Sequence, residues 1–226
     1  MGLLFSVIDQ NYPPKAKWSV NDIPDLSSKI TIVTGGSSGL GYETAKALLS
    51  HNATVYLACR DSKKTTSVIE KLKQETGKTA IFLELDLASL GSVKNAAEIF
   101  KTGVMCPPME QLTKEGYDLQ FGTNVLGHFY FTSLLLPELK AGAQTSSPDR
   151  VSRVIHTSSQ IHVLAKLNYE TFIDSQARRK LGLNGLYGQS KFGNIVFSNE
   201  LARRHGKDGI TSIAVHPDIS HRSFEE

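Results

Sequence analysis

The spacing of apolar and polar positions changes several times along the chain, and these changes predict alternating strands and helices. Short apolar runs typical of buried strands alternate with segments whose apolar residues recur at helical spacing. This alternation is typical of an α/β fold with a doubly wound parallel sheet of the Rossmann type. The predicted elements of the first half are strand Ile30–Val33, helix Gly41–Ser50, strand Thr54–Cys59, helix Lys63–Thr76, strand Ala80–Leu85 and helix Ser92–Phe100.

The second half continues the pattern less regularly. Pro, Gly and Ser between residues 136 and 153 predict a surface loop, and residues 164–185 read as an irregular insertion. Prolines mark residues 9–28 as extended, so we expect an N-terminal arm (1–28) and a single dinucleotide-binding domain (29–226). The remaining predicted elements are helix Leu112–Leu136, strand Arg153–Thr157, helix Leu186–His205 and strand Ile210–His216.

The turn after the first strand, Thr34-Gly35-Gly36-Ser37-Ser38-Gly39-Leu40-Gly41, is the most specific signal in this half. Glycine allows a tight turn and a close backbone approach to phosphate, and the next helix offers N–H groups and a positive dipole end. Glycines this close together also suit an ordinary flexible turn, but here a strand precedes them and a helix and strand follow. We expect dinucleotide contacts from Gly35, Ser37, Ser38, Gly39, Leu40 and Gly41.

Composition narrows the function classes. The 226 residues are 40% hydrophobic, enough for one substantial core. A net charge of +3 is spread over segments of mixed sign, so nucleic acid is not an expected partner. The two cysteines, Cys59 and Cys106, are too few for a disulfide framework and lack metal-ligand spacing, which indicates a reducing compartment and no metal site.

The N-terminal apolar run, Leu3 to Ile8, is too short for a signal-peptide core or a membrane span, and no later run is long enough. We therefore expect a soluble, cytoplasmic protein. Gly2 and Ser6 fit the loose pattern for N-myristoylation, which leaves peripheral membrane contact open as an alternative.

A tyrosine and a lysine, Tyr187 and Lys191, stand four residues apart on a predicted helix and therefore share one face. A phenol with its ordinary pKa of about 10 is a poor acid–base catalyst at neutral pH, but a nearby ammonium favours the tyrosinate. Such a pair could protonate a carbonyl as hydride arrives. The same spacing is also common in ordinary surface pairs, so the glycine turn is needed to favour the catalytic interpretation.

Together these motifs resemble the short-chain dehydrogenase/reductase family, from about Lys29 to Pro217. The glycine spacing is that of the family's compact branch. Asn124, in Asn-Val-Leu-Gly-His-Phe, matches the active-site asparagine, and His156-Thr-Ser-Ser ends a strand where the family keeps its catalytic serine. The pattern favours Ser159, the second serine of that motif. Retinol-dehydrogenase-like members look most similar.

The resemblance implies a role for each matched residue. Tyr187 would be the proton donor or acceptor, and Lys191 would lower the Tyr187 pKa and bond the nicotinamide ribose. Ser159 would hold the substrate oxygen, and Asn124 would position a water in a proton relay. Asp86, followed by Leu87, would meet the adenine. Capping or turn roles are ordinary alternatives for Asn, Ser and Asp.

The end of the second strand bears on cofactor choice. An acidic residue there would bond the ribose 2′-hydroxyl of NAD, whereas Arg60 offers a guanidinium suited to the 2′-phosphate of NADP. We therefore expect NADP in preference to NAD, although Asp61, the acidic residue that comes next, argues for NAD.

The chain also departs from the family pattern. Between the helices predicted to end near Phe100 and begin near Leu112, only Thr102–Met105 remains where the family has its fourth, central strand. Pro217-Asp218 replaces the usual Pro-Gly, and the sequence ends at Glu226 before a seventh strand. A truncated, spliced or misannotated reductase that lacks both strands is therefore expected.

Two functions follow as expectations. The first is an NADP-dependent oxidoreductase that interconverts a small lipophilic alcohol and its aldehyde or ketone, in a protein that the resemblance suggests can pair as a homodimer. The second is a catalytically impaired remnant that binds nucleotide weakly or only a partner protein.

Overall fold

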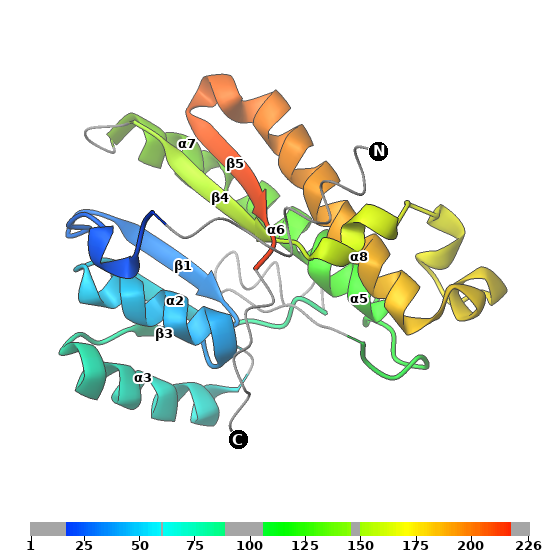
Figure 1. The fold of residues 1–226 in the computed structure, drawn as a ribbon, viewed down its shortest axis with the longest axis horizontal. Coiled ribbons are helices and arrows are strands. Elements are labelled where there is room, and N and C mark those ends of the chain that lie inside the picture. The colour runs from blue at the N-terminus through cyan, green and yellow to red at the C-terminus, as the bar shows by residue number, and fades with distance from the viewer. Residues whose placement is uncertain (1–16, 60, 89–105, 146–149, 218–226) are drawn as a thin grey trace.

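The computed structural model describes residues 17–59, 61–88, 106–145 and 150–217 (Figure 1). Its strands form two parallel sheets, and in the three-stranded sheet β2 lies between β1 and β3. Parallel strands with helices between them confirm the predicted α/β class. The first sheet contains β1 (Ile30–Thr34), β2 (Thr54–Cys59) and β3 (Ile81–Glu84), and the second contains β4 (Ser152–Thr157) and β5 (Ile210–Val215).

Helices α2 (Gly39–Ser50) and α3 (Ser62–Thr76) cover one face of the first sheet (Figure 1). Apolar side chains from both helices and from the strands form one buried cluster, as the apolar spacing predicts. Asp61 caps α3, because its side chain accepts a hydrogen bond from the backbone N–H of Lys64 at 2.9 Å. The fully buried members of the cluster include Leu49, Val55, Leu57 and Leu72.

The parallel register brings the ends of β1 and β2 to the same edge of the sheet. Thr34 pairs with Ala58, and the Gly35 N–H donates to the Ala58 carbonyl at 3.0 Å. The glycine turn therefore begins directly beside the end of β2, where ligands bind in open α/β sheets.

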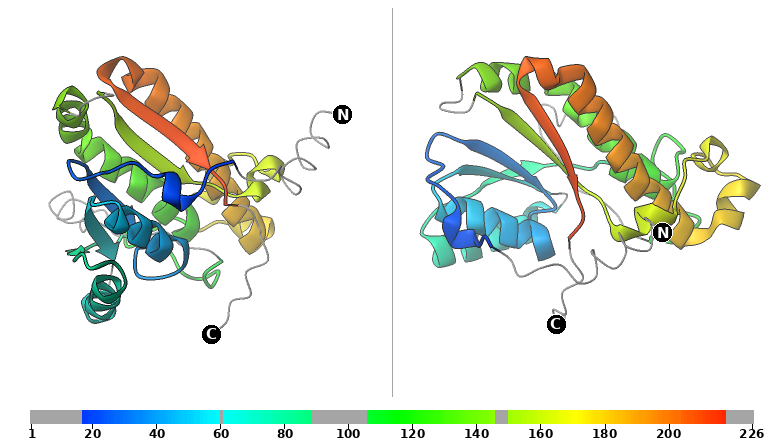
Figure 2. Two further views of the ribbon diagram at one scale, coloured as in Figure 1. Left: turned by 60° about the vertical axis from the view of Figure 1, so that its left-hand side comes forward. Right: turned by 45° about the horizontal axis from the view of Figure 1, so that its top comes forward.

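The second sheet packs against a long helix, α8 (Gln176–His205), which runs beside β5 in both views of Figure 2. Helix α7 (Leu136–Thr145) packs against β4. The short helical segments that come before it are α5 (Leu119–Phe121), the π-helical turn η2 (Gly122–Gly127) and α6 (His128–Leu134). The short 3₁₀ segments are η1 (Val20–Asp22), η3 (Gln160–Leu164), η4 (Tyr169–Thr171) and η5 (Gly206–Asp208).

The prediction of one helix from Leu112 to Leu136 is wrong. Leu112 and Tyr117 form isolated β-bridges instead, and the helix begins after Asp118, whose carboxylate accepts from the Phe121 N–H at 2.8 Å. Asp118 thus acts as an N-cap, which apolar spacing alone does not reveal.

Two further boundaries differ from the prediction. Residues 136–145, expected in a loop, form α7. Pro137 does not prevent this, because it stands in the first turn of the helix, where proline is tolerated. Helix α8 begins at Gln176 and not at Leu186, because the Ser175 hydroxyl caps it by accepting from the Arg178 N–H at 3.0 Å. The backbone is non-helical at Gly182 (φ 72°, ψ 169°), which kinks α8 before Tyr187.

The two sheets stay separate in the part of the chain that the structure describes. There no strand pairs with the second edge of β1 or of β4. Ile30 on β1 is 71% exposed and Ile155 on β4 is 54% exposed, unusual values for strands in the middle of an α/β fold. The predicted helix 92–100, the segment 102–105 and Arg60 lie outside the described residues.

Candidate active site

The glycine turn has the close packing that its sequence predicts. Gly35 and Gly39 have positive φ angles of 71° and 53°, which favour glycine. A Cβ on Gly41 would lie 2.3 Å from the Gly35 carbonyl oxygen, so any side chain there would push the helix away from the turn. Ser38 stands at the N-cap of α2 without a side-chain cap hydrogen bond, and Ser38, Gly39 and Leu40 are exposed. The residues present therefore fit an anionic phosphate group.

Two glycines outside the predicted contact set have the same kind of constraint. A Cβ on Gly36 would lie 2.5 Å from Leu57 Cδ2, and one on Gly127 would lie 2.6 Å from the Leu87 carbonyl oxygen. Gly127 thus lets η2 pack on the chain after β3, where Leu87 is buried. The Asp86 carboxylate accepts from the Ala88 N–H at 3.2 Å, which is a turn role and leaves its second oxygen for a ligand.

Helix α8 brings Tyr187 and Lys191 together. The Lys191 Nζ lies 5.4 Å from the centroid of the Tyr187 ring and donates to the Thr157 carbonyl at 2.9 Å. Asn194, on the same face, donates to that carbonyl at 3.0 Å. The carboxyl end of β4 therefore lies against the predicted catalytic helix.

The pKa values of this pair differ from the expectation. Burial lowers the pKa of Lys191 to about 8. Burial also raises the pKa of Tyr187; the hydrogen bond from Ser159 opposes this rise, and the nearby Cys106 adds to it. The expected lowering of the Tyr187 pKa by Lys191 is thus not found in this arrangement, because desolvation of the phenol dominates.

The two serines after β4 have different partners. The Ser158 hydroxyl is buried and donates to the Lys191 carbonyl at 2.9 Å, so it holds α8 to the strand. The Ser159 side chain is only partly buried and lies close enough to Tyr187 to lower the pKa of the phenol. Of the two serines, Ser159 is therefore the one that acts on the phenol.

Asn124 lies in the π-helical turn η2, and such turns often occur at functional sites. Its side-chain amide donates to the Ser190 hydroxyl at 3.0 Å, and that hydroxyl donates to the Tyr187 carbonyl at 2.8 Å. Asn124 is thereby fixed against the turn of α8 between Tyr187 and Lys191.

Two histidines behind this cluster were not predicted. Burial lowers the pKa of both His128 and His156 to about 4, and the positive charge of Lys191 contributes at His128. The His128 Nδ1 lies 3.1 Å from the Thr123 carbonyl oxygen, which fixes the ring orientation. Both rings are therefore neutral at pH 7. The sequence signals that could have found them were the position of His128, four residues after Asn124, and that of His156, near the end of β4.

Replacing Lys191 with Met is expected to stabilise the fold at pH 7. The folded-state pKa near 8 is below the ordinary lysine pKa of 10.5, so folding disfavours the charged form. This penalty, up to about 3 kcal/mol, is fully present below pH 8 and disappears as pH rises through 10.5. The Thr157 carbonyl keeps its bond from Asn194. Urea unfolding at pH 7 and pH 10.5 checks this; a variant less stable at pH 7 would contradict it.

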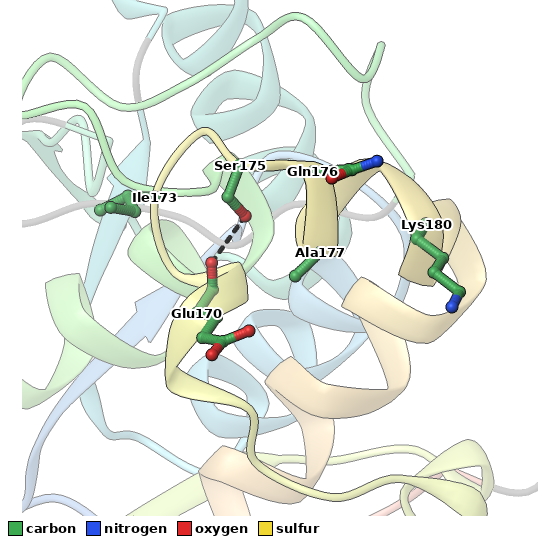
Figure 3. Close-up of a pocket in the computed structure, with 6 residues that line it drawn as sticks. All are labelled: Glu170, Ile173, Ser175, Gln176, Ala177 and Lys180. Carbon is green, nitrogen blue, oxygen red and sulfur yellow. Dashed lines mark hydrogen bonds between the residues drawn. The ribbon is translucent and has the colours of Figure 1, made fainter.

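An open depression elsewhere on the surface, lined by residues of η4 and the start of α8, is shown in Figure 3. None of the predicted site residues lines it. Its lining residues are Glu170, Ile173, Ser175, Gln176, Ala177 and Lys180.

Comparison with known proteins gives the family. The family model described as short chain dehydrogenase matches residues 29–169, more than half of the chain. The chain belongs to the short-chain dehydrogenase/reductase family. Within the described residues, no helix of this dehydrogenase/reductase is both long and apolar enough to cross a membrane.

Relatives extend the match on both sides of this region. A short-chain dehydrogenase/reductase of Armillaria gallica is 53% identical over 229 residues, 96% of this chain and 73% of that protein. Human retinol dehydrogenase 11 is 34% identical over 88% of this chain and 65% of its own length. The Armillaria alignment is longer than this 226-residue chain although it leaves part of it out, so that relative has positions without a counterpart here. The chain is an NAD(P)-dependent, retinol-dehydrogenase-like enzyme of this family.

Solved structures agree on the fold. An uncharacterized protein from Mycobacterium paratuberculosis superposes with a TM-score of 0.77 at 32% identity, over 92% of this chain and 75% of that one. A short chain dehydrogenase from Shigella flexneri, complexed with NADP, has a TM-score of 0.64 at 24% identity, over 85% of this chain and 78% of that one. The Rossmann-type α/β fold is therefore shared with proteins of this family.

Proposed function

We propose that the protein interconverts a lipophilic alcohol and its aldehyde or ketone with NADP as the hydride carrier. The observation that carries this proposal is the convergence of Tyr187, Ser159, Lys191 and Asn124 at the carboxyl end of β4. The influence of Ser159 on the Tyr187 pKa and the hydrogen-bond chain from Asn124 through Ser190 to the Tyr187 backbone support it.

In the direction of carbonyl reduction, a reduced nicotinamide, when bound, would supply the hydride for the carbonyl carbon. The Ser159 hydroxyl and the Tyr187 phenol both donate to the carbonyl oxygen. Tyr187 then gives its proton to that oxygen as the carbon–oxygen double bond becomes single. A proton from solvent returns to Tyr187 past Lys191, whose pKa near 8 suits proton exchange at neutral pH.

The cofactor would lie across the end of the first sheet. The backbone from Gly35 to Gly41 would hold the pyrophosphate, Asp86 and Leu87 would meet the adenine, and Lys191 would reach the nicotinamide ribose. Asn124 would hold a water behind Lys191.

Two residues after β2 favour NADP over NAD. Arg60, which follows this strand in the sequence, could pair with a 2′-phosphate. Asp61 could have bonded a ribose hydroxyl, but one of its carboxylate oxygens already accepts the capping hydrogen bond of α3. The NADP bound to the Shigella relative is consistent with this choice. A lipophilic substrate is supported by the 34% identity to retinol dehydrogenases 11 and 12.

A second candidate is a catalytically impaired protein that only binds nucleotide or a partner. The exposed Ile30 and Ile155 on strand edges without a described partner, and the extra positions in the Armillaria relative, favour it.

Turnover separates the two candidates. Absorbance of NADPH at 340 nm is followed with a panel of lipophilic aldehydes such as retinal and decanal, and the assay is repeated with NADH. We expect NADPH consumption and slower consumption of NADH. Folded protein whose melting temperature rises with NADPH but which consumes none would support the second candidate.

A further inference from the structure

The chain from Cys106 to Gln111 reaches the neighbourhood of Tyr187. Cys106 has a positive φ of 44°, a conformation that a non-glycine residue keeps only where its surroundings hold it. Its Sγ lies 3.7 Å from the Asn184 Oδ1, one helical turn before Tyr187, and after burial it is the second group that raises the pKa of the phenol. This segment, 106–111, is therefore next to the proposed proton donor; we call it the Cys106 segment.

A buried amide ties the Cys106 segment to the catalytic helix. Gln120 is only 1% exposed; its Oε1 accepts from the Cys106 N–H at 2.9 Å and its Nε2 donates to the Leu183 carbonyl at 3.0 Å. Leu183 is the first residue after the kink at Gly182. Gln120 thus connects this segment to the start of the helical stretch that carries Tyr187 and Lys191.

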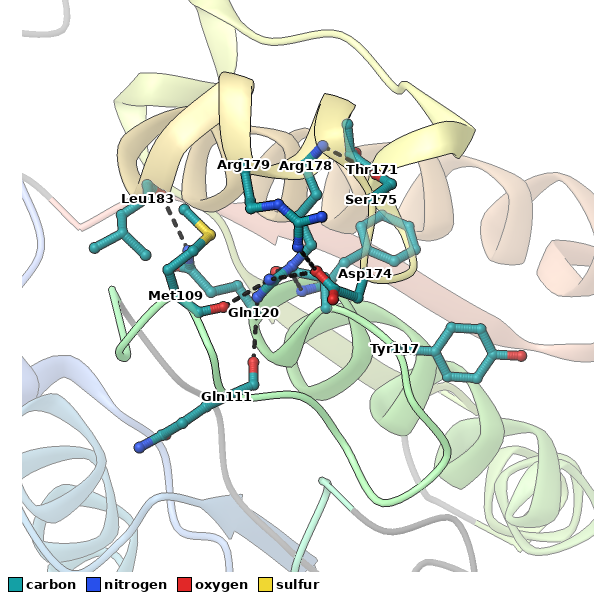
Figure 4. A network of polar contacts seen from close by, with 12 residues as sticks. Met109, Gln111, Tyr117, Gln120, Thr171, Asp174, Ser175, Arg178, Arg179 and Leu183 are labelled. Carbon is teal, nitrogen blue, oxygen red and sulfur yellow. Dashed lines mark hydrogen bonds and ion pairs between the residues drawn. The ribbon is translucent and has the colours of Figure 1, made fainter.

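A buried guanidinium holds the other end of the Cys106 segment (Figure 4). The Arg178 Nε donates to Asp118 at 2.9 Å, while Nη1 donates to the Met109 carbonyl at 2.6 Å and Nη2 to the Gln111 carbonyl at 3.2 Å. Only a forked, planar donor can reach all three acceptors at once. Arg178 lies before the kink at Gly182, and Gln120 bonds to Leu183 just after it. The Cys106 segment is therefore tied to α8 on both sides of the kink.

We propose that Gln120 and Arg178 are positioning residues that hold the Cys106 segment as a wall of the active site beside Tyr187. This proposal rests on the proposed function. The wall keeps water from the phenol and so maintains the burial that dominates its environment. Without either residue, the Cys106 segment would move away and water would reach Tyr187. The pH dependence of turnover would then shift, an effect that a loss of fold stability alone would not produce.

The test uses Gln120→Met, which keeps the side-chain length and loses both hydrogen bonds. Gln189→Met is the matched control: Gln189 is equally buried and also bridges two groups, the Asn168 N–H and the Thr171 hydroxyl, both at 2.7 Å, but neither lies in the Cys106 segment. Arg178→Lys is a second variant that retains the charge beside Asp118 but not the fork.

Two measurements are made on the folded proteins: the rate of Cys106 alkylation by iodoacetamide, with Cys59 buried, and the pH profile of kcat/KM. We expect Gln120→Met and Arg178→Lys to change the alkylation rate by about fivefold or more. We also expect them to shift the Tyr187 limb of the profile to lower pH. Gln189→Met should do neither.

Equal alkylation rates in Gln120→Met and Gln189→Met would overturn the proposal, and so would a changed rate with an unshifted profile. Wild-type protein without turnover would contradict the proposed function instead, and the alkylation rates would still decide whether Gln120 and Arg178 hold the wall.

Discussion

Replacing Tyr187 with Phe is expected to lower kcat by about two to four orders of magnitude, the usual contribution of a general acid or base. The change removes only the phenolic oxygen, so the ring stays beside Lys191 and cofactor affinity should change little. The rate of NADPH oxidation measures the first effect, and a fluorescence titration with NADPH measures the second.

Tyr169→Phe is the matched control for this substitution, because Tyr169 lies on η4 and is 75% exposed. It should keep the wild-type kcat. Turnover that survives in Tyr187→Phe would remove the tyrosine from the mechanism, whatever the cofactor affinity.

Replacing Arg178 with Met is expected to lower the free energy of unfolding by about 3–5 kcal/mol, because it leaves a buried charge without its partner. The partner is Asp118, whose side chain is only 2% exposed, and two backbone carbonyls lose their donor as well. Urea denaturation gives the value.

The neighbouring Arg179 provides a stringent control. Its side chain is 58% exposed and pairs with Asp174, so Arg179→Met should cost about 0–1 kcal/mol. Adding Asp118→Leu to Arg178→Met should restore part of the stability, although this second change removes the cap on the Phe121 N–H. Equal losses in the two arginine variants would mean that the buried pair contributes no more than the exposed one.

The first half of the fold was predictable because local sequence decides it. Strand β2 matches its predicted bounds, and α2 and α3 begin within two residues of theirs, since apolar spacing and the glycine turn act over a few residues. These elements also pack on one another in chain order.

The second half was predicted less well because side-chain caps and tertiary contacts set its boundaries. Asp118 and Ser175 start helices through hydrogen bonds that the apolar pattern does not encode. The kink at Gly182 and the π-helical turn around Asn124 are likewise absent from the apolar pattern. Sequence order predicted which residues would gather around Tyr187, but not that burial would raise the Tyr187 pKa.

The contacts around the site were the least predictable. Arg178 and Gln120 are polar residues in segments that read as irregular or helical, and their acceptors are backbone carbonyls far away in the sequence. Only the folded chain brings them together.

The most direct test of the central claim, hydride transfer at the Tyr187 site, follows the hydrogen itself. The protein is incubated with a lipophilic aldehyde and NADPH carrying deuterium on the transferable position of C4, and the alcohol is analysed by mass spectrometry. We predict one deuterium on the carbinol carbon with the wild-type chain and no product above background with Tyr187→Phe. Alcohol formed without deuterium, or equal labelled product from both proteins, would contradict the account.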